Sequence, residues 1–121
     1  MPEGYEEKFV SRLEDLQFLG DERFAQWWTE QRQVQKKGLK VIRMELFQKG
    51  VDHSVIDSVL EEFEDDTDVI QNLAEKRWQR YIGKPVDEQK RKTTDFLLRR
   101  GYTYSQIRPI IDELVRSSYT S

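Results

Sequence analysis

Side chains that could perform catalysis or bind a transition metal are scarce in this sequence. Cysteine is absent, and histidine occurs once, at His53. Zinc sites use several Cys and His ligands and a thiol nucleophile needs a cysteine, so neither kind of site can be assembled. His53 directly follows Asp52, a residue type that commonly caps helices. We therefore interpret His53 as an exposed residue in the first turn of a helix.

The run Asp65-Asp66-Thr67-Asp68 brings three carboxylates together, as a metal site would require. It lacks the central Gly and the closing Glu of a calcium-binding EF-hand loop, so we interpret it as a solvated, helix-capping region. Paired acids such as Glu61-Glu62 return at the same place in each repeat described below, which favours a structural role. The sequence contains no glycine-rich phosphate loop and no credible Ser/His/Asp arrangement. It predicts a protein that is not an enzyme, with no metal and no cofactor.

Basic residues give a stronger functional signal, because they form groups at related places in the chain. Lys40 of the first group matches Arg91 of the second when the sequence is shifted by 51 residues. A basic stripe repeated at a fixed spacing can meet phosphates or acidic side chains at regular intervals. The sequence therefore predicts a surface that binds another macromolecule. Its candidate residues are Lys36, Lys37, Lys40, Arg43, Lys76, Arg77, Arg80, Lys90, Arg91, Lys92, Arg99 and Arg100.

Charge is segregated along the chain. Residues 61–75 contain seven acids and no base, whereas residues 76–100 contain nine bases and three acids, a net charge of about +6. Such segregation is typical of a charged surface that a partner recognises, although a solvated helix face is an equally good interpretation at this point. The net charge of the whole chain is −3, which argues against an indiscriminate nucleic-acid binder.

An internal repeat organises the chain. A shift of 51 residues pairs glycines, aliphatic residues and tryptophans in order. A shift of 47 residues adds a partial third copy, in which residues 13–16 match residues 60–63. The repeat predicts the end of a truncated first unit at residues 1–19, then whole units at residues 20–63 and 64–121. The matched pairs include Trp27 with Trp78, Leu46 with Leu97, Gly50 with Gly101, Ser54 with Ser105, and Ile56 with Ile107.

Each whole unit is predicted to contain three helices, because apolar residues recur at helical spacing between capping and glycine signals. In the first unit, Asp21 and Asp52 are expected caps and Gly50 ends the middle helix. In the second unit, the middle helix ends at Gly101 and the last is capped by Thr103 or Ser105. The three tryptophans are expected in the core. Pro109 is expected to delay or kink the last helix.

Composition agrees with a folded, helical chain. Of 121 residues, 36% are hydrophobic and 12% aromatic, with only six Gly and three Pro. The predicted fold class is all-α, with tandem three-helix repeats stacked into an elongated, curved helical array. No apolar run is long enough to span a membrane, and no signal peptide opens the chain. We expect a soluble, cytoplasmic monomer with no membrane partner.

Three segments resemble the RecX family of regulatory proteins. Residues 19–25 are similar to the family's Asp-Glu-Arg-Phe-Ala helix start. Residues 37–51 are similar to its Gly-x-x-x-Ile-x-x-Glu-Leu-x-x-Lys-Gly core motif. Residues 96–107 are similar to its Phe-Leu-x-Arg-Gly-Phe/Tyr repeat. Together these segments run in order across most of the chain.

The resemblance implies tandem three-helix repeats and a role in DNA repair, recombination and the SOS response. It implies a negative modulator that binds the filament of RecA on single-stranded DNA and limits its growth, ATP hydrolysis and strand exchange. Some family members also bind DNA directly. The alternative to filament binding is a helical module that binds DNA directly. In this hypothesis, the three short helices of a unit act like a helix-turn-helix domain on single-stranded or duplex DNA.

Overall fold

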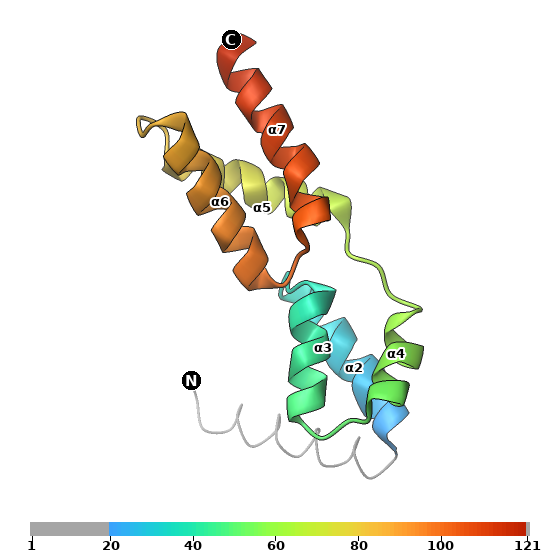
Figure 1. Cartoon of the computed structure of the whole chain (residues 1–121). Coiled ribbons are helices and arrows are strands. Elements are labelled where there is room, and N and C mark those ends of the chain that lie inside the picture. Colours follow the sequence, from blue (N-terminus) through green and yellow to red (C-terminus); the bar gives the residue numbers. More distant parts are fainter. Residues whose placement is uncertain (1–19, 121) are drawn as a thin grey trace, which may run out of the picture.

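The computed structural model describes residues 20–120, and within this range every regular element is a helix. Helices α2 to α4 form a first trio and helices α5 to α7 a second, and the two trios follow one another along an elongated molecule (Figure 1). The predicted all-α fold of tandem three-helix repeats is confirmed. The predicted repeat remnant at 1–19 lies outside the described residues. The helices are α2 (Asp21–Val34), α3 (Leu39–Gln48), α4 (His53–Leu60), α5 (Thr67–Arg80), α6 (Val86–Arg100) and α7 (Tyr104–Thr120).

Each trio has its own apolar core, to which every helix contributes one face. In the first trio, Phe24 of α2, Ile42 and Leu46 of α3 and Ile56 of α4 are fully buried. In the second trio, apolar residues of α5, α6 and α7 form a separate cluster. Burying one such side chain contributes about 1.5–3 kcal/mol to folding, so each trio has its own source of stability. The second cluster consists of Ile70, Ala74, Trp78, Leu97, Tyr102, Ile107, Ile110 and Ile111.

The tryptophans behave largely as the sequence predicts. Trp28 and Trp78 are buried, and Trp27 is half-buried against the core of the first trio. The indole Nε1 of Trp28 donates to the carboxylate of Glu45 at 3.1 Å, and Arg32 donates to the same carboxylate at 2.9 and 2.7 Å. This shared carboxylate satisfies the polar edge of a large buried ring and ties α2 to α3.

The 51-residue period describes the second and third helices of each trio but not the first. Leu46 and Leu97 are both fully buried, as are Ile56 and Ile107. Helix α3 has 10 residues and α6 has 15. Because α6 is longer, α5 lies earlier in the second unit than a constant shift of 51 residues from α2 would place it. Trp78 therefore lies further along α5 than Trp27 does along α2, and pairing these two residues was wrong.

Most expected helix boundaries agree with the structure. Thr103 precedes α7 and caps it, because its Oγ1 accepts from the amide of Gln106 at 3.3 Å. Asp52 occupies the N-cap position of α4 without a side-chain capping bond, and α2 is capped by Gly20 rather than Asp21. Helix α7 begins directly at Tyr104 and continues through Pro109, so the expected late start was wrong.

The two trios meet where the turn between α2 and α3 touches the turn between α6 and α7. The amide of Gly38 donates to the carbonyl of Arg100 at 2.7 Å, and the amide of Lys40 donates to the carbonyl of Gly101 at 3.2 Å. A Cβ atom at position 38 would overlap the carbonyl of Gly101 and lie 2.7 Å from the amide nitrogen of Tyr102. Glycine is therefore required at position 38 for this close backbone approach. We call this contact the junction.

Lys36 adopts an unusual backbone conformation that serves the junction. It has a φ of 63°, the left-handed region that costs an ordinary L-residue about 1–2 kcal/mol. Its carbonyl accepts from the hydroxyl of Tyr102 at 2.9 Å and from Nε of Arg100 at 3.3 Å. These hydrogen bonds from the second trio offset the local strain. The helix pairs with extensive packing all lie inside one trio, so the junction and the linker at 61–66 connect the two trios.

Candidate partner-binding surface

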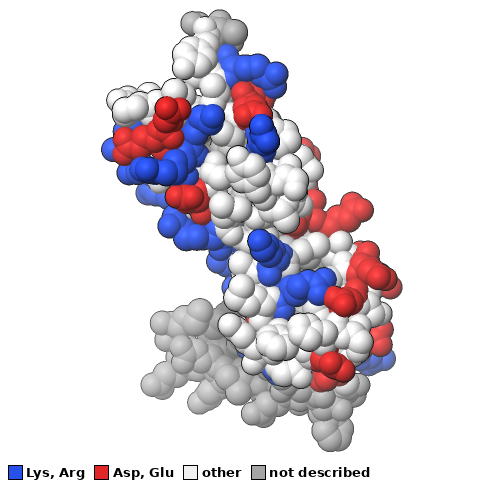
Figure 2. Space-filling model, in the orientation of Figure 1, with Lys and Arg blue, Asp and Glu red and all other residues white. Residues whose placement is uncertain are grey.

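The candidate basic residues fall into two groups, one on each trio. The first trio contributes the group from Lys36 to Arg43, around the start of α3. The second trio contributes residues of α5 and α6, where the bases of 76–100 outnumber the acids. In Figure 2, blue side chains gather along the left flank of the second trio, over α6 as oriented in Figure 1. Red side chains lie along the right side of the molecule, and others lie among the blue ones on the left flank (Figure 2).

The junction brings the two groups close to one another. The Nη2 atom of Arg100 donates to the carbonyl of Gln35 at 2.7 Å, next to Lys36 and Lys37. Partial burial lowers the pKa of Lys37, and the nearby positive charges of Arg100 and Arg32 lower it further. The opposing charge of Glu45 is the smallest of these influences. The end of α6 and the start of α3 thus form one concentration of positive charge.

Four of the twelve candidates engage residues of the chain itself. Arg77 lies over the ring of Phe96 with 3.7 Å to the ring centroid, and Arg100 donates to the backbone of the first trio. Arg43 forms an ion pair with Asp57, and Lys92 forms one with Glu88 at 3.4 Å. Cations engaged in this way are less available to a partner, because a new contact must compete with an existing one.

The side chains of seven candidates have no hydrogen-bonding or ion-pairing partner in the part of the chain that the structure describes. All of them are exposed except Lys90, which is half-buried. Such cations keep their charge available for an incoming acidic group, and their interaction weakens as salt is added. These are the residues that a binding partner could contact without displacing an existing interaction. They are Lys36, Lys40, Lys76, Arg80, Lys90, Arg91 and Arg99.

The acidic residues act as caps and bridges. The carboxylate of Asp66 accepts from the amide of Asp68 at 2.9 Å and so caps α5. Glu61 and Glu62 are exposed, and His53 stacks against Phe47 with 4.6 Å between the ring centroids. Among residues 20–120, no group of three His, Cys, Asp or Glu side chains could hold a metal ion. In the same range, no helix is both long and apolar enough to cross a membrane.

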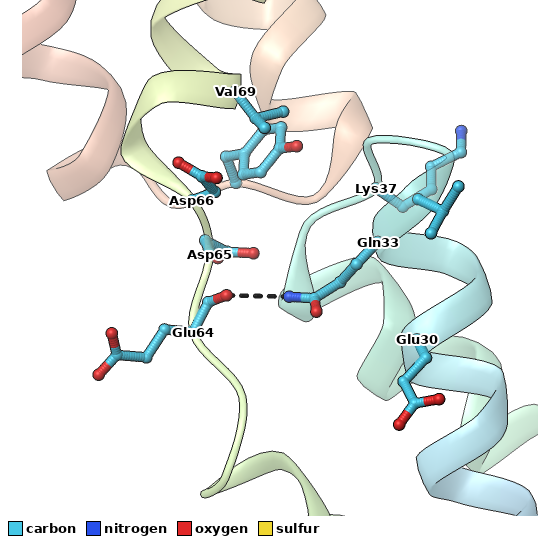
Figure 3. A pocket seen from close by; sticks show the side chains of 9 residues that line it. Glu30, Gln33, Lys37, Glu64, Asp65, Asp66 and Val69 are labelled. Atoms are coloured by element: carbon cyan, nitrogen blue, oxygen red, sulfur yellow. Dashed lines mark hydrogen bonds between the residues drawn. The ribbon is translucent and has the colours of Figure 1, made fainter.

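A groove of about 500 Å³ lies between α2 and the linker that leads into α5 (Figure 3). Gln33 closes one part of it by donating to the carbonyl of Glu64 at 2.9 Å. The side chain of Asp65 points across the groove toward the first trio, whereas that of Glu64 points away from it. The remaining walls include Glu30, Val34, Lys37, Asp66, Val69 and Tyr102.

Comparison with known proteins assigns the family. Residues 21–60 match the family model for the second three-helix domain of RecX, and residues 64–111 match the model for the third. A regulatory protein RecX from Chlorobium phaeobacteroides is 32% identical over 113 residues, which cover 92% of this chain and 73% of that protein. This chain belongs to the RecX family.

Other RecX proteins agree with the assignment. The regulatory protein RecX of Clostridium tetani is 27% identical over 97% of this chain and 57% of its own length. The crystal structure of RecX from Lactobacillus salivarius superposes with a TM-score of 0.71 and 29% identity, covering 93% of this chain and 75% of that chain. The chain spans about half the length of the curated RecX relatives that it matches first.

Sequence reasoning identified the basic residues of this RecX-family chain but missed the residues that hold the two groups together. Gly101 is predicted as a helix stop, but its contact with Gly38 is not predicted. Asp65 was assigned to a solvated loop, whereas it is half-buried and accepts two hydrogen bonds. Each glycine lies in a turn between two helices of its own trio, and nothing local in the sequence pairs one turn with the other.

Proposed function

We propose that this chain is a negative modulator of the RecA recombinase, which binds the RecA filament on single-stranded DNA and limits its growth, ATP hydrolysis and strand exchange. Membership of the RecX family is the observation that carries this proposal. The relatives that support it are named regulatory proteins, and RecA is the partner that the family resemblance implies.

The basic surface supports binding to a large acidic partner. The side chains of Arg80, Arg91 and Arg99 on α5 and α6 form no hydrogen bond or ion pair among the described residues, and Lys36 and Lys40 extend the same charge across the junction. A repetitive partner such as a nucleoprotein filament offers acidic side chains and phosphates at regular intervals. Charge complementarity of this kind raises the association rate and selects the orientation of the complex.

The proposal is tested by adding the purified chain to RecA assembled on single-stranded DNA. We expect ATP hydrolysis to fall at micromolar concentrations of the chain, and the chain to co-sediment with the filament. Normal ATP hydrolysis together with no co-sedimentation would contradict the proposal. Because filament binding is partly electrostatic, inhibition should weaken as salt is raised.

Direct binding to DNA is the second candidate function, and the positive charge of residues 76–100 is the observation that favours it. A DNA-binding module would bind bare single-stranded or duplex DNA without RecA, and its affinity would fall steeply with salt because phosphate contacts release counterions. Fluorescence anisotropy with labelled DNA measures both properties. Filament inhibition without affinity for bare DNA would reject this candidate and retain the first.

A further inference from the structure

Asp65, in the linker between α4 and α5, holds one helix from each trio. Its Oδ1 accepts a hydrogen bond from the amide of Leu39, the first residue of α3, at 3.0 Å. Its Oδ2 accepts from Nε2 of Gln106, in the first turn of α7, at 3.0 Å. One carboxylate therefore joins the N-terminal ends of two helices that lie in different trios.

Helix α3 needs an external acceptor at its start. The first amides of a helix have no partner within it, and a side chain at the N-cap commonly accepts from one of them. The N-cap of α3 is Gly38, which has no side chain because its backbone lies against Gly101. The first turn of α3 also contains no acidic residue. The carbonyl of Gly101 accepts from the amide of Lys40, and Asp65 accepts from the amide of Leu39. Asp65 also places a negative charge at the positive end of the helix dipole.

The other contact of Asp65 has a fixed orientation. Gln106 uses its Oε1 to accept from the amide of Thr103 at 2.8 Å, while Thr103 accepts from the amide of Gln106 in return. This reciprocal capping box leaves the Nε2 group of Gln106 available to donate to Asp65. Rotating the amide of Gln106 would break the cap of α7, so the contact cannot be replaced by a simple flip.

We propose that Asp65 is a positioning residue, which fixes the angle between the two trios and thereby holds their two basic groups in register for one partner. The two trios have separate cores and little helix packing between them, so their relative orientation depends on the hydrogen bonds of the junction and on those of Asp65. The contribution of Asp65 to partner binding rests on the proposed function, whereas its effect on the angle between the trios does not. A pre-oriented pair of binding groups loses less entropy on association than a loosely joined pair.

The angle is tested with paired spin labels. The natural chain contains no cysteine, so Gln48→Cys on α3 and Gln79→Cys on α5 introduce two unique labelling sites on exposed positions. Electron-electron double resonance should give a narrow distance distribution for this labelled chain. Asp65→Ala should broaden the distribution while circular dichroism shows unchanged helicity. Glu64→Ala is the matched control, because it removes the neighbouring acid, whose side chain points away from the groove (Figure 3), and should leave the distribution narrow.

The same variants are then tested for inhibition of ATP hydrolysis by RecA on single-stranded DNA. We expect Asp65→Ala to require about tenfold more protein than the unsubstituted chain, and Glu64→Ala to be equivalent to it. An unchanged distance distribution in Asp65→Ala overturns the role of Asp65 in setting the angle. A broadened distribution with unchanged inhibition overturns its role in positioning the basic groups. Absence of inhibition by the unsubstituted chain contradicts the proposed function, while the distance measurement still decides whether Asp65 sets the angle.

Discussion

The α-carbons of Gly101 and Gly38 face one another across the junction so closely that neither position has room for a side chain. A Cβ at Gly101 would lie 2.7 Å from Cβ of Val41 and 2.8 Å from the carbonyl oxygen of Gly38. Both distances are well inside van der Waals contact. The backbones of the two trios therefore meet directly, and the hydrogen bonds from Gly38 and Lys40 depend on this approach.

Gly101→Ala is expected to destabilise the chain more than Gly83→Ala. Both glycines have a left-handed backbone, with φ of 102° and 100°, so both substitutions carry the same conformational strain of about 1–2 kcal/mol. Only alanine at position 101 also meets neighbouring atoms, because nothing lies within 4 Å of a Cβ at Gly83. This overlap should add about 1–3 kcal/mol, measured by urea unfolding. Equal losses in the two variants would show that the junction tolerates a side chain.

Tyr102 makes the stability of the chain sensitive to strongly alkaline pH. Burial, reinforced by the charge of Asp65, raises the pKa of its hydroxyl from 10.0 to about 12. Below about pH 10, Tyr102 is protonated in both the folded and the unfolded chain. Between about pH 10 and 12 the unfolded chain ionises first, so stability is lost as the pH rises.

Substitution of Tyr102 by phenylalanine isolates this effect from the titration of lysines. We expect the urea midpoint of the unsubstituted chain to fall more steeply between about pH 10 and 12 than that of Tyr102→Phe. At neutral pH, Tyr102→Phe should cost about 1 kcal/mol, because its hydroxyl no longer donates to the carbonyl of Lys36. Parallel pH profiles for the two proteins would contradict the assignment.

Two N-cap residues are expected to contribute differently to stability. Thr103→Ala removes a side-chain acceptor from the capping box of α7 and should cost about 1 kcal/mol. Asp52→Ala at the N-cap of α4 removes no capping hydrogen bond and should cost about 0.5 kcal/mol, the contribution of a charge near a helix terminus. Urea unfolding of both variants measures the difference. A larger loss for Asp52→Ala would contradict the capping geometry.

Local patterns were sufficient to predict most of the fold. Helical periodicity, together with stops at Gly50 and Gly101, predicts the buried residues of the second and third helices in each trio. A constant shift does not match the residues of α2 with those of α5, because α6 is longer than α3. A repeat with helices of unequal length keeps its order but not a single period.

The candidate site was predictable in its charges but not in its contacts. Sequence reasoning selects Arg100 because it is basic and lies in a basic helix, but its bond to the carbonyl of Gln35 spans 65 residues. The two contacts of Asp65 likewise span 26 and 41 residues. None of these three contacts follows from a local propensity, because each depends on how the two trios are placed against one another.

The most direct test of the central claim is charge reversal on the surface formed by α5 and α6. The double substitution Arg80→Glu and Arg91→Glu alters two exposed cations without ion-pair partners among the described residues. Its control, Arg108→Glu with Arg116→Glu, makes the same change of charge on α7, where each arginine forms an ion pair within the helix.

The measurement is the concentration of each variant that halves ATP hydrolysis by RecA on single-stranded DNA, with helicity verified by circular dichroism. We predict that the Arg80 and Arg91 variant requires at least about tenfold more protein than the unsubstituted chain, and that the α7 control stays within about twofold. Equal behaviour of the two double variants would contradict a binding surface on α5 and α6.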